Sequence, residues 1–199
     1  MKVIAINCSP RQKGSTATLL HHMEKRLTEK GHDVEFVPLY DLQFKGCKAC
    51  QACQKKGAPI CAINDELIPV LEAMEQADAI ILGSPVFIGL VTGCAKSLID
   101  RCYTFYSEER SKIIKQKIFT DVITQSGDIQ YFKYVREHLY AWFIESFEMQ
   151  SGGSLIAAGL SSAKDLKAQP EIFAKADEIT DKIDQLFKEN RKKHKPSDH

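Results

Sequence analysis

The sequence contains no apolar run that approaches the roughly 20 residues needed to span a bilayer. It also has almost no net charge, because 27 basic residues are balanced by 26 acidic ones for a formal charge of +1. The first absence excludes a transmembrane helix, and the second leaves no broad electrostatic attraction for nucleic acid. The first residues are typical of a strand and lack the layout of a signal peptide. We therefore expect a cytoplasmic protein with no nucleic-acid or membrane partner.

Two common nucleotide-binding motifs, GxGxxG and GxxxxGK[ST], are missing, which argues against dinucleotide or ATP binding by those routes. Internal repeats and low-complexity linkers are missing as well. The 199 residues are enough for one well-buried domain. We expect a single domain over residues 1–190, with a cysteine-rich loop inserted at residues 41–64 and a basic tail at residues 191–199.

The sequence does contain a polar loop, CSPRQKGST, at residues 8–16. Residues 3–6 before it are apolar throughout, which is typical of a strand buried on both faces. Residues 17–30 after it place their leucines and methionine at helical spacing, which predicts a helix. A polar loop at a helix N-terminus can bind an anion, because the first-turn N–H groups have no partner within the helix.

We therefore predict a phosphate site in this loop. Gly14 would let the backbone approach the anion, and Ser15, Thr16 and Thr18 would add hydroxyl donors. The alternative is a surface turn without a ligand, in which Ser15 or Thr16 is the N-cap of the helix.

Apolar strand patterns and amphipathic helix patterns alternate five times along the chain. The expected strands are residues 2–7, 34–39, 79–83, 117–124 and 153–159, and the expected helices are residues 17–30, 65–76, 92–106, 131–148 and a closing helix from residue 172. Right-handed crossovers then require a parallel sheet with helices on both faces. Ligands of such α/β sheets bind outside the carboxyl ends of the strands, where residues 8–16, 84–89 and 125–128 would meet.

Flavin mononucleotide (FMN) suits these three loops, because it needs one phosphate site, one apolar surface and further polar contacts. Residues 85–89 can offer N–H groups to the ring, with Val86, Phe87 and Ile88 packed on its face. An ordinary strand-to-helix turn with Phe87 in the core is the alternative. The aromatic residues at helical spacing in residues 131–148, Trp142 among them, are interpreted as core.

The segments SPRQKGST and GSPVFIGLVTGCAKSLIDR, together with the alternation, resemble the flavodoxin-like NAD(P)H-dependent FMN reductase superfamily. This resemblance implies a flavodoxin-like three-layer α/β sandwich with a five-stranded parallel sheet in the order 2-1-3-4-5. It also implies non-covalently bound FMN, a homodimer or homotetramer, and no side chain with an obligatory catalytic role. The expected FMN-binding residues are Ser9, Arg11, Gly14, Ser15, Thr16, Pro85, Val86, Phe87, Ile88, Gly89, Gln125, Ser126 and Gly127. Asp100 and Arg101 are interpreted as a solvated or locally paired helix face.

Seven cysteines, an odd number, argue against complete disulfide pairing in a reducing compartment. Cys47, Cys50 and Cys53 form a CxxCxxC motif, and Cys61 follows eight positions later. Four thiolates this close can ligate one [4Fe-4S] cluster. The loop also resembles that of the iron-sulfur flavoproteins, a branch of the same superfamily.

Two alternatives for these cysteines stay open, namely thiols without any metal, as in other flavin reductases of the superfamily, and a zinc site. Cys8, Cys94 and Cys102 are expected to be small buried hydrophobic residues.

The leading functional hypothesis is an FMN-dependent oxidoreductase. It would move electrons from NAD(P)H or a ferredoxin-like donor through the flavin to a small acceptor such as a quinone, nitro or azo compound. The alternative is a non-enzymatic module that binds a phosphate ligand and uses the cysteine loop as a redox or metal sensor. The resemblance further implies that subunits share the flavin pocket, and Tyr103, Phe105 and Tyr106 are expected to form an aromatic surface suited to such a contact.

Overall fold

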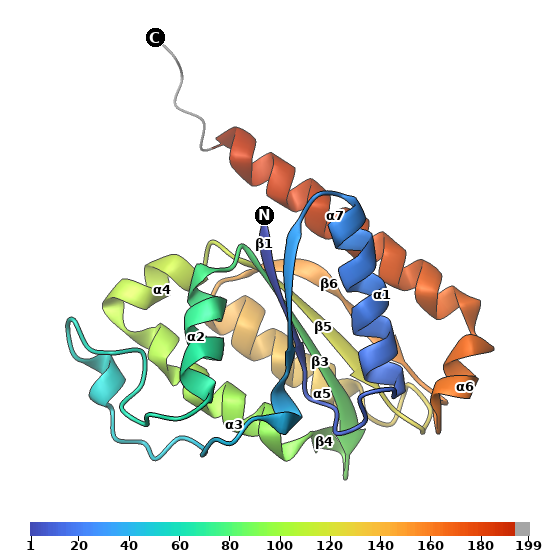
Figure 1. The fold of residues 1–199 in the computed structure, drawn as a ribbon, viewed down its shortest axis with the longest axis horizontal. Helices are drawn as coiled ribbons and strands as arrows, with labels where there is room; N and C mark the ends of the chain where they lie inside the picture. Colours follow the sequence, from blue (N-terminus) through green and yellow to red (C-terminus); the bar gives the residue numbers. More distant parts are fainter. Residues whose placement is uncertain (194–199) are drawn as a thin grey trace.

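Five parallel strands form the centre of the computed structural model, which describes the fold of residues 1–193 (Figure 1). The strands are β1 (Lys2–Asn7), β2 (Asp33–Pro38), β3 (Ala79–Phe87), β5 (Ile118–Thr124) and β6 (Gln150–Ala157). They pair in the order β2-β1-β3-β5-β6, and a short strand β4 (Leu90–Val91) pairs antiparallel with the end of β3. The predicted parallel sheet and its 2-1-3-4-5 order are confirmed.

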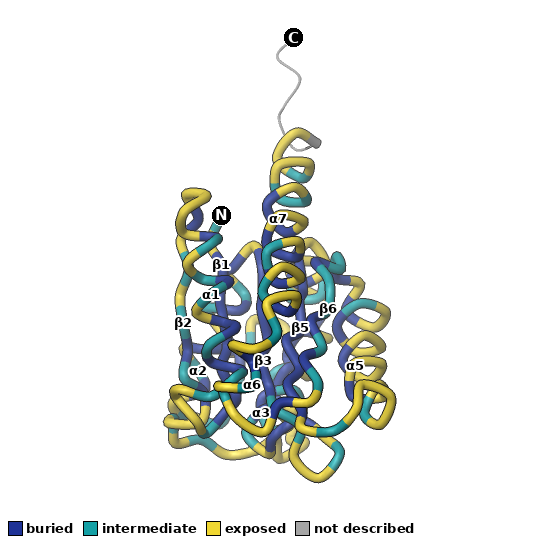
Figure 2. The backbone as a smooth tube through the Cα atoms, turned by 90° about the vertical axis from the view of Figure 1, so that its right-hand side faces the viewer, coloured by how far each residue is buried: buried dark blue, intermediate teal, exposed yellow. Residues whose placement is uncertain are grey.

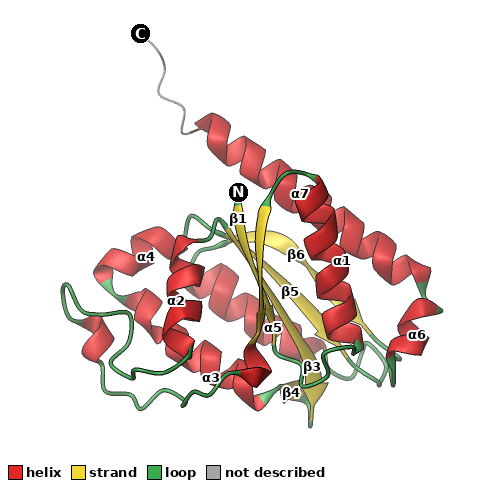
Figure 3. Ribbon diagram, viewed as in Figure 1, coloured by secondary structure: helices red, strands yellow, loops and turns green. Residues whose placement is uncertain are grey.

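Helices cover both faces of the sheet, as Figure 3 shows. One face carries α1 (Ser15–Glu29), α6 (Ala163–Lys167) and α7 (Pro170–Lys193). The other face carries α2 (Leu67–Gln76), α3 (Gly93–Arg101), α4 (Glu108–Ile114) and α5 (Lys133–Tyr140). The expected flavodoxin-like three-layer α/β fold is therefore the observed one. Among residues 1–193, no helix combines the length and the apolar character that crossing a membrane requires.

Strands β1, β3 and β5 supply two hydrophobic cores, because successive side chains of a strand point to opposite faces. Ile4 and Ile6 of β1 lie in the core beneath α2 and α3, whereas Val3 and Ala5 lie in the core beneath α1 and α7. Strands β1, β3 and β5 are accordingly the most buried part of the tube in Figure 2. A strand buried on both faces has apolar residues at successive positions, which explains the unbroken apolar run at residues 3–6.

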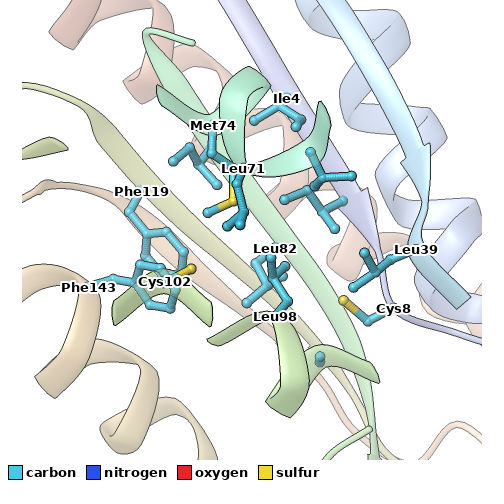
Figure 4. Packing of buried hydrophobic residues seen from close by; sticks show 14 of the residues in the cluster. Ile4, Cys8, Leu39, Leu71, Met74, Leu82, Leu98, Cys102, Phe119 and Phe143 are labelled. Atoms are coloured by element: carbon cyan, nitrogen blue, oxygen red, sulfur yellow. The ribbon is translucent and has the colours of Figure 1, made fainter. Parts of the chain in front are cut away.

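The core on the α2 and α3 side is shown in Figure 4. The rings of Phe119 and Phe143 stack there at a centroid distance of 4.0 Å. Cys8 and Cys102 are both fully buried in this core, as the sequence predicted. Cys94 is only half buried, so that part of the prediction was wrong.

Two predicted helices end early. The helix expected at 92–106 is α3 to Arg101 and a tighter 3-10 helix over Cys102–Tyr106, in which aromatic residues of lower helix propensity follow one another. The helix expected at 131–148 is α5 followed by a π-helical turn over Ala141–Ser146. This turn leaves Trp142 largely exposed, although it was expected in the core, while Phe143 is buried.

Strand β6 begins at Gln150, three residues before the predicted start at 153. Gly152 and Gly153 both lie inside the strand, at a register shift against β5. A Cβ atom on Gly152 would lie 2.4 Å from Thr120 Oγ1, so the close packing of the two strands requires a glycine there.

Helix α7 runs to Lys193, past the expected boundary between the domain and the basic tail at 190/191. The rest of the expected tail, residues 194–199, lies outside the described residues.

Asp121 is a buried carboxyl in the centre of β5. Ser154 on the neighbouring strand donates a hydrogen bond to its Oδ2 at 2.5 Å. Burial nevertheless raises the pKa of Asp121 to about 6. In the unfolded chain an aspartate has a pKa of about 3.9, so the stability that the neutral carboxyl contributes is complete below that pH and is lost as the pH rises to about 6.

We expect Asp121→Asn to raise the free energy of unfolding above that of the wild type by about 1–3 kcal/mol at pH 8, because the asparagine cannot ionise. The gain should shrink as the pH falls from 6 to 4. Urea denaturation across this pH range measures it, with the exposed Asp33→Asn as the matched control. A gain that is constant with pH would contradict this account of Asp121.

Candidate functional site

A cavity of about 670 Å³ lies at the carboxyl edge of the sheet. Its lining comes from the segments that follow β1, β5 and β6 and from the end of β3, namely Ser9, Arg11, Lys13, Gly14, Ser15, Thr16, Pro85, Val86, Phe87, Thr124, Gln125, Ser126, Leu160, Ser161, Ser162 and Ala163. All of the expected FMN-binding residues line it except Ile88, Gly89 and Gly127. Parallel strand pairing therefore brings the three predicted loops to one site.

The N-terminus of α1 opens into this cavity without a side-chain cap. Gly14 is the N-cap residue in an extended conformation, and no side chain of the described residues caps the helix by accepting a hydrogen bond from its first-turn N–H groups. The alternative of a Ser15 or Thr16 N-cap is therefore not observed. A Cβ atom on Gly14 would lie 2.9 Å from Arg11 Cβ, so a larger residue would push the loop apart. Free first-turn N–H groups and the helix dipole favour an anion here.

Two cations, Arg11 and Lys13, line the same part of the cavity, and within residues 1–193 neither forms an ion pair with a carboxylate. The loop that holds Arg11 is fixed by short-range hydrogen bonds. Ser9 N donates to Asn7 Oδ1 at 3.1 Å, and Arg11 N donates to Ser9 Oγ at 3.1 Å. The positive charge is thus held beside the uncapped helix end and is available to an anionic ligand.

The hydroxyl groups of the loop have different roles from those expected. Thr18 Oγ1 donates to the Gly14 carbonyl at 2.9 Å, which is a contact within the helix, and Thr18 does not line the cavity. Thr16 Oγ1 lies 2.7 Å from Thr124 Oγ1 in a buried bond that ties α1 to β5. Ser15 Oγ donates to the Ser162 carbonyl at 3.3 Å. The backbone N–H groups, rather than these hydroxyls, are the main donors left for a ligand.

The segment expected as a loop at 84–89 is a β-hairpin. Strand β3 continues through Pro85 to Phe87, and residues 88 and 89 form the turn into β4. Proline is tolerated here because it lies near the end of the strand. Val86 and half-exposed Phe87 line the cavity, whereas Ile88 is fully exposed to solvent and does not line it.

The turn of this hairpin is strained. Ile88 has a φ of 46°, a left-handed conformation that is rare for a β-branched residue. Gly89 has a φ of 80°, and a Cβ atom there would lie 2.6 Å from the hydroxyl of Tyr134. Gly89 therefore shapes the backbone of the site but does not line it.

Gln125 places an unpaired polar group in the wall of the cavity. Its side chain is 4% exposed, Nε2 donates to the Asp128 carbonyl at 2.9 Å, and the buried Oε1 has no partner in residues 1–193. A buried acceptor without a partner costs about 1–3 kcal/mol. Gly127 lies behind the wall, where a Cβ atom would be 3.3 Å from Phe132.

A fourth segment, residues 160–163, was not predicted as part of the site. It follows β6, and Ser162 caps α6 through a reciprocal capping box with Asp165. The signal was present in the sequence, since two serines follow the last predicted strand at the same edge. Lys13 was likewise visible in the loop but was not expected as a site residue.

The cysteine-rich loop connects β2 to α2 and extends to the left of α2 in Figure 1. Cys47 and Cys50 are exposed, and Cys53 and Cys61 are half buried. In the part of the chain that the structure describes, no three histidine, cysteine or acidic residues converge into a metal-binding group. The expected cysteine quartet is therefore not gathered around a common centre.

Two of the four sulfurs nevertheless accept backbone hydrogen bonds. Ala49 N donates to Cys47 Sγ at 3.4 Å, and Ile63 N donates to Cys61 Sγ at 3.5 Å. Both bonds run from the residue two positions later in the chain. Such N–H donors stabilise negative charge on sulfur, as a ligating thiolate requires.

Arg101 holds the two ends of this loop together. Its buried guanidinium, 2% exposed, donates to the Lys45 carbonyl at 3.0 Å, the Ile63 carbonyl at 3.1 Å and Asp65 Oδ2 at 2.7 Å. Burial is the largest influence on Asp65 and works against its ionisation, but the hydrogen bonds from Arg101, Lys45 N and Leu67 N and the charge of Arg101 together lower the pKa of that carboxyl. The Arg101 side chain also contacts Cys61.

The prediction that Asp100 and Arg101 form a solvated or locally paired face of α3 is therefore correct for Asp100 only. Asp100 forms an exposed ion pair with Lys96 at 2.5 Å, whereas Arg101 is a buried anchor. The expected aromatic surface also needs correction, because Phe105 is buried while Tyr103 and Tyr106 are exposed.

Comparison with known proteins identifies a matching family and several similar proteins. The sequence pattern described as NADPH-dependent FMN reductase matches residues 1–161. The chain is 36% identical over 134 residues to an iron-sulfur flavoprotein of Archaeoglobus fulgidus, which covers 66% of this chain and 64% of the relative. It is 41% identical over 101 residues to an iron-sulfur flavoprotein of Methanocaldococcus jannaschii, which covers 51% of each. The chain spans less than two thirds of the length of either relative.

A solved structure with a similar fold is the NAD(P)H:quinone oxidoreductase from Methanothermobacter marburgensis. The TM-score is 0.71 at 17% sequence identity, with 90% of this chain and 95% of that chain covered. At this identity the likeness concerns the fold alone.

Replacing Arg101, which anchors the cysteine-rich loop, should destabilise the protein. We expect Arg101→Met to lower the free energy of unfolding by about 3–5 kcal/mol, because Asp65 and two carbonyl groups lose their buried partner. Urea denaturation measures this loss, and limited proteolysis should show earlier cleavage within residues 45–65. The neighbouring Asp100→Asn, which removes only an exposed ion pair, should change stability by less than about 1 kcal/mol. Equal effects of the two substitutions would refute the anchoring role.

Proposed function

Because the chain belongs to the NADPH-dependent FMN reductase family, we propose that the cavity at the carboxyl edge binds FMN and that the protein is an FMN-dependent NAD(P)H oxidoreductase. Membership confirms the resemblance drawn from SPRQKGST and GSPVFIGLVTGCAKSLIDR. Among residues 1–193, the observation that best supports this proposal is one cavity lined by an uncapped helix N-terminus, by two cations without carboxylate partners and by Gln125, whose buried amide oxygen has no partner.

The residues present fit the chemistry of FMN. The first-turn N–H groups of α1 with Arg11 and Lys13 suit the phosphate, which carries up to two negative charges. Val86 and Phe87 offer apolar surface to the isoalloxazine. The Gln125 amide oxygen can accept from a ring N–H group, which would satisfy the buried atom.

Bound FMN supplies the redox chemistry, because the isoalloxazine accepts a hydride and can return electrons singly or in pairs. The chain itself binds and orients the cofactor, and no side chain in the cavity needs to act as an acid or a base. A quinone, a nitro compound or an azo compound is the proposed class of acceptor. The quinone in the name of the similar Methanothermobacter marburgensis structure is consistent with this class.

A [4Fe-4S] cluster is a second proposal, with Cys47, Cys50, Cys53 and Cys61 as its ligands. It is supported by the N–H donors to two of the sulfurs, by the Arg101 guanidinium beside Cys61, and by the name iron-sulfur flavoprotein given to both relatives. The four sulfurs would have to move together, since they do not converge in this structure. With a cluster, a ferredoxin-like protein would be an additional electron donor.

A cytoplasmic location and a homodimer or homotetramer are also proposed. Tyr103, Tyr106 and Trp142 border an apolar groove of about 180 Å³, which offers surface to a second copy of the chain. Sedimentation equilibrium tests the assembly, and a monomer would contradict it.

The cofactor proposal is tested by comparing FMN with riboflavin, which lacks the phosphate. We expect the purified protein to be yellow, to be bleached anaerobically by NADH or NADPH, and to bind FMN more tightly than riboflavin. Arg11→Ala should weaken FMN binding about tenfold and leave riboflavin binding nearly unchanged, because a charged hydrogen bond to the phosphate is lost.

Fluorescence quenching measures both affinities, and the remote Lys25→Ala serves as the matched charge control. Equal loss for the two flavins would contradict the phosphate assignment. A colourless protein that binds a different phosphate ester would instead support the non-enzymatic module.

The cluster proposal is tested separately by iron and sulfide analysis of protein purified without oxygen. We expect about four irons per chain if the cubane is present, with Cys50→Ser losing the iron and retaining the flavin. Cys102→Ser, at a buried cysteine outside the loop, should keep both. Zinc without sulfide, or no metal at all, would overturn the cluster and leave the flavin proposal intact.

A further inference from the structure

Two cysteines outside the cysteine-rich loop lie side by side at the carboxyl edge of the sheet. Cys8 directly follows β1, and Cys94 is the second residue of α3. Cys94 Sγ lies 3.4 Å from the Cys8 carbonyl oxygen, and the Cys8 thiol is close enough to shift the pKa of Cys94. Thr92 joins them, because its Oγ1 donates to the Cys8 carbonyl at 2.9 Å and lies 3.2 Å from Cys94 Sγ.

The two thiols are not equivalent. Cys8 is 0% exposed, and its burial raises its pKa well above the ordinary value. Cys94 is half exposed at the N-terminus of α3. The hydrogen bond from Cys8, helped by the N–H groups of Ala95 and Cys94, lowers the pKa of Cys94 to about 6. Cys94 is therefore a partly exposed thiol with a lowered pKa, next to the buried thiol of Cys8 with a raised pKa.

Cys102 provides a contrast within the same helix region. It is equally buried, burial raises its pKa, and the nearby Asp100 adds to the effect. A buried thiol without a stabilised thiolate is unreactive toward oxidants.

We propose that Cys8 and Cys94 form a redox-sensitive pair in which Cys94 is the nucleophile and Cys8 the resolving thiol. The Cys94 thiolate attacks one oxygen of hydrogen peroxide, the O–O bond breaks, and the second oxygen leaves as hydroxide and becomes water. Cys94 is then a sulfenic acid. The Cys8 sulfur attacks the Cys94 sulfur, and the sulfenic hydroxyl leaves as water with the Cys8 proton. The two thiols lose two electrons and two protons in total, and one peroxide yields two waters.

The resulting disulfide bond between Cys8 and Cys94 would tie the end of β1 to the first turn of α3. Cys8 precedes Ser9, which lines the cavity, so the bridge would form directly beside the proposed ligand site. The pairing itself requires neither flavin nor cluster, and it can be tested without either.

The test is disulfide mapping of the full chain after treatment with hydrogen peroxide and alkylation of the remaining thiols. Trypsin alone leaves Cys61 and Cys94 in one peptide, residues 57–96, so a glutamate-specific protease must be added. We expect a disulfide between peptide 3–11, which holds Cys8, and peptide 76–96, which holds Cys94. Before oxidation, iodoacetamide should label Cys94 at least about tenfold faster than Cys102, because the thiolate is the reactive form.

Three variants separate the roles of the two thiols. Cys8→Ala should stop the reaction at a sulfenic acid on Cys94, which dimedone traps. Cys94→Ser should leave Cys8 unmodified, and the control Cys102→Ser should still form the bridge. Thermal unfolding monitors the fold of each variant.

The proposal is overturned if Cys94 reacts no faster than Cys102, or if oxidised Cys94 is bridged to a cysteine of residues 47–61 in place of Cys8. Both outcomes can be read in the wild type alone, so a variant that fails to fold does not weaken the test. Neither outcome bears on the flavin proposal, whose measurements are separate.

Discussion

Hydrogen bonding between parallel strands is the constraint on which the site depends. The register aligns Asn7 of β1 with Gly83 of β3, and Thr124 of β5 with Pro85 on one side and Ala157 of β6 on the other. Apolar side chains on both faces stabilise this register, because a slip of one residue would exchange the two cores. Segments far apart in the sequence therefore end next to one another, and topology rather than any single loop makes the cavity.

Much of this arrangement could be predicted from the sequence, since strands buried on both faces and amphipathic helices have distinct patterns. The role of Arg101 could not. Its neighbour Asp100 and the cation Lys96 at helical spacing suggest a surface network, whereas the true partner, Asp65, lies 36 residues earlier. Only tertiary packing shows that one cation of α3 points inward and the other outward.

In the candidate site, the sequence predicted the segments but not the orientation of every side chain. The three loops were found because each follows an apolar run, and the fourth, with its two serines, obeys the same rule after β6. The sequence was less informative about which side chains of these segments face the cavity. Ile88, Gly89 and Gly127 belong to the right segments, but a tight hairpin and the packing of Phe132 and Tyr134 set their backbone and turn them away from the lining. A motif identifies a segment, while the local turn decides the orientation of each residue.

The anchoring of the cysteine-rich loop at one guanidinium makes that loop a separable module. Because its two ends meet at Arg101, the cost of closing the chain between them grows only slowly with its length. Residues between the anchors can be added, lost or exchanged while β2 and α2 keep their places. A flavodoxin-like scaffold built in this way can acquire or discard a metal centre during evolution without any change to its sheet.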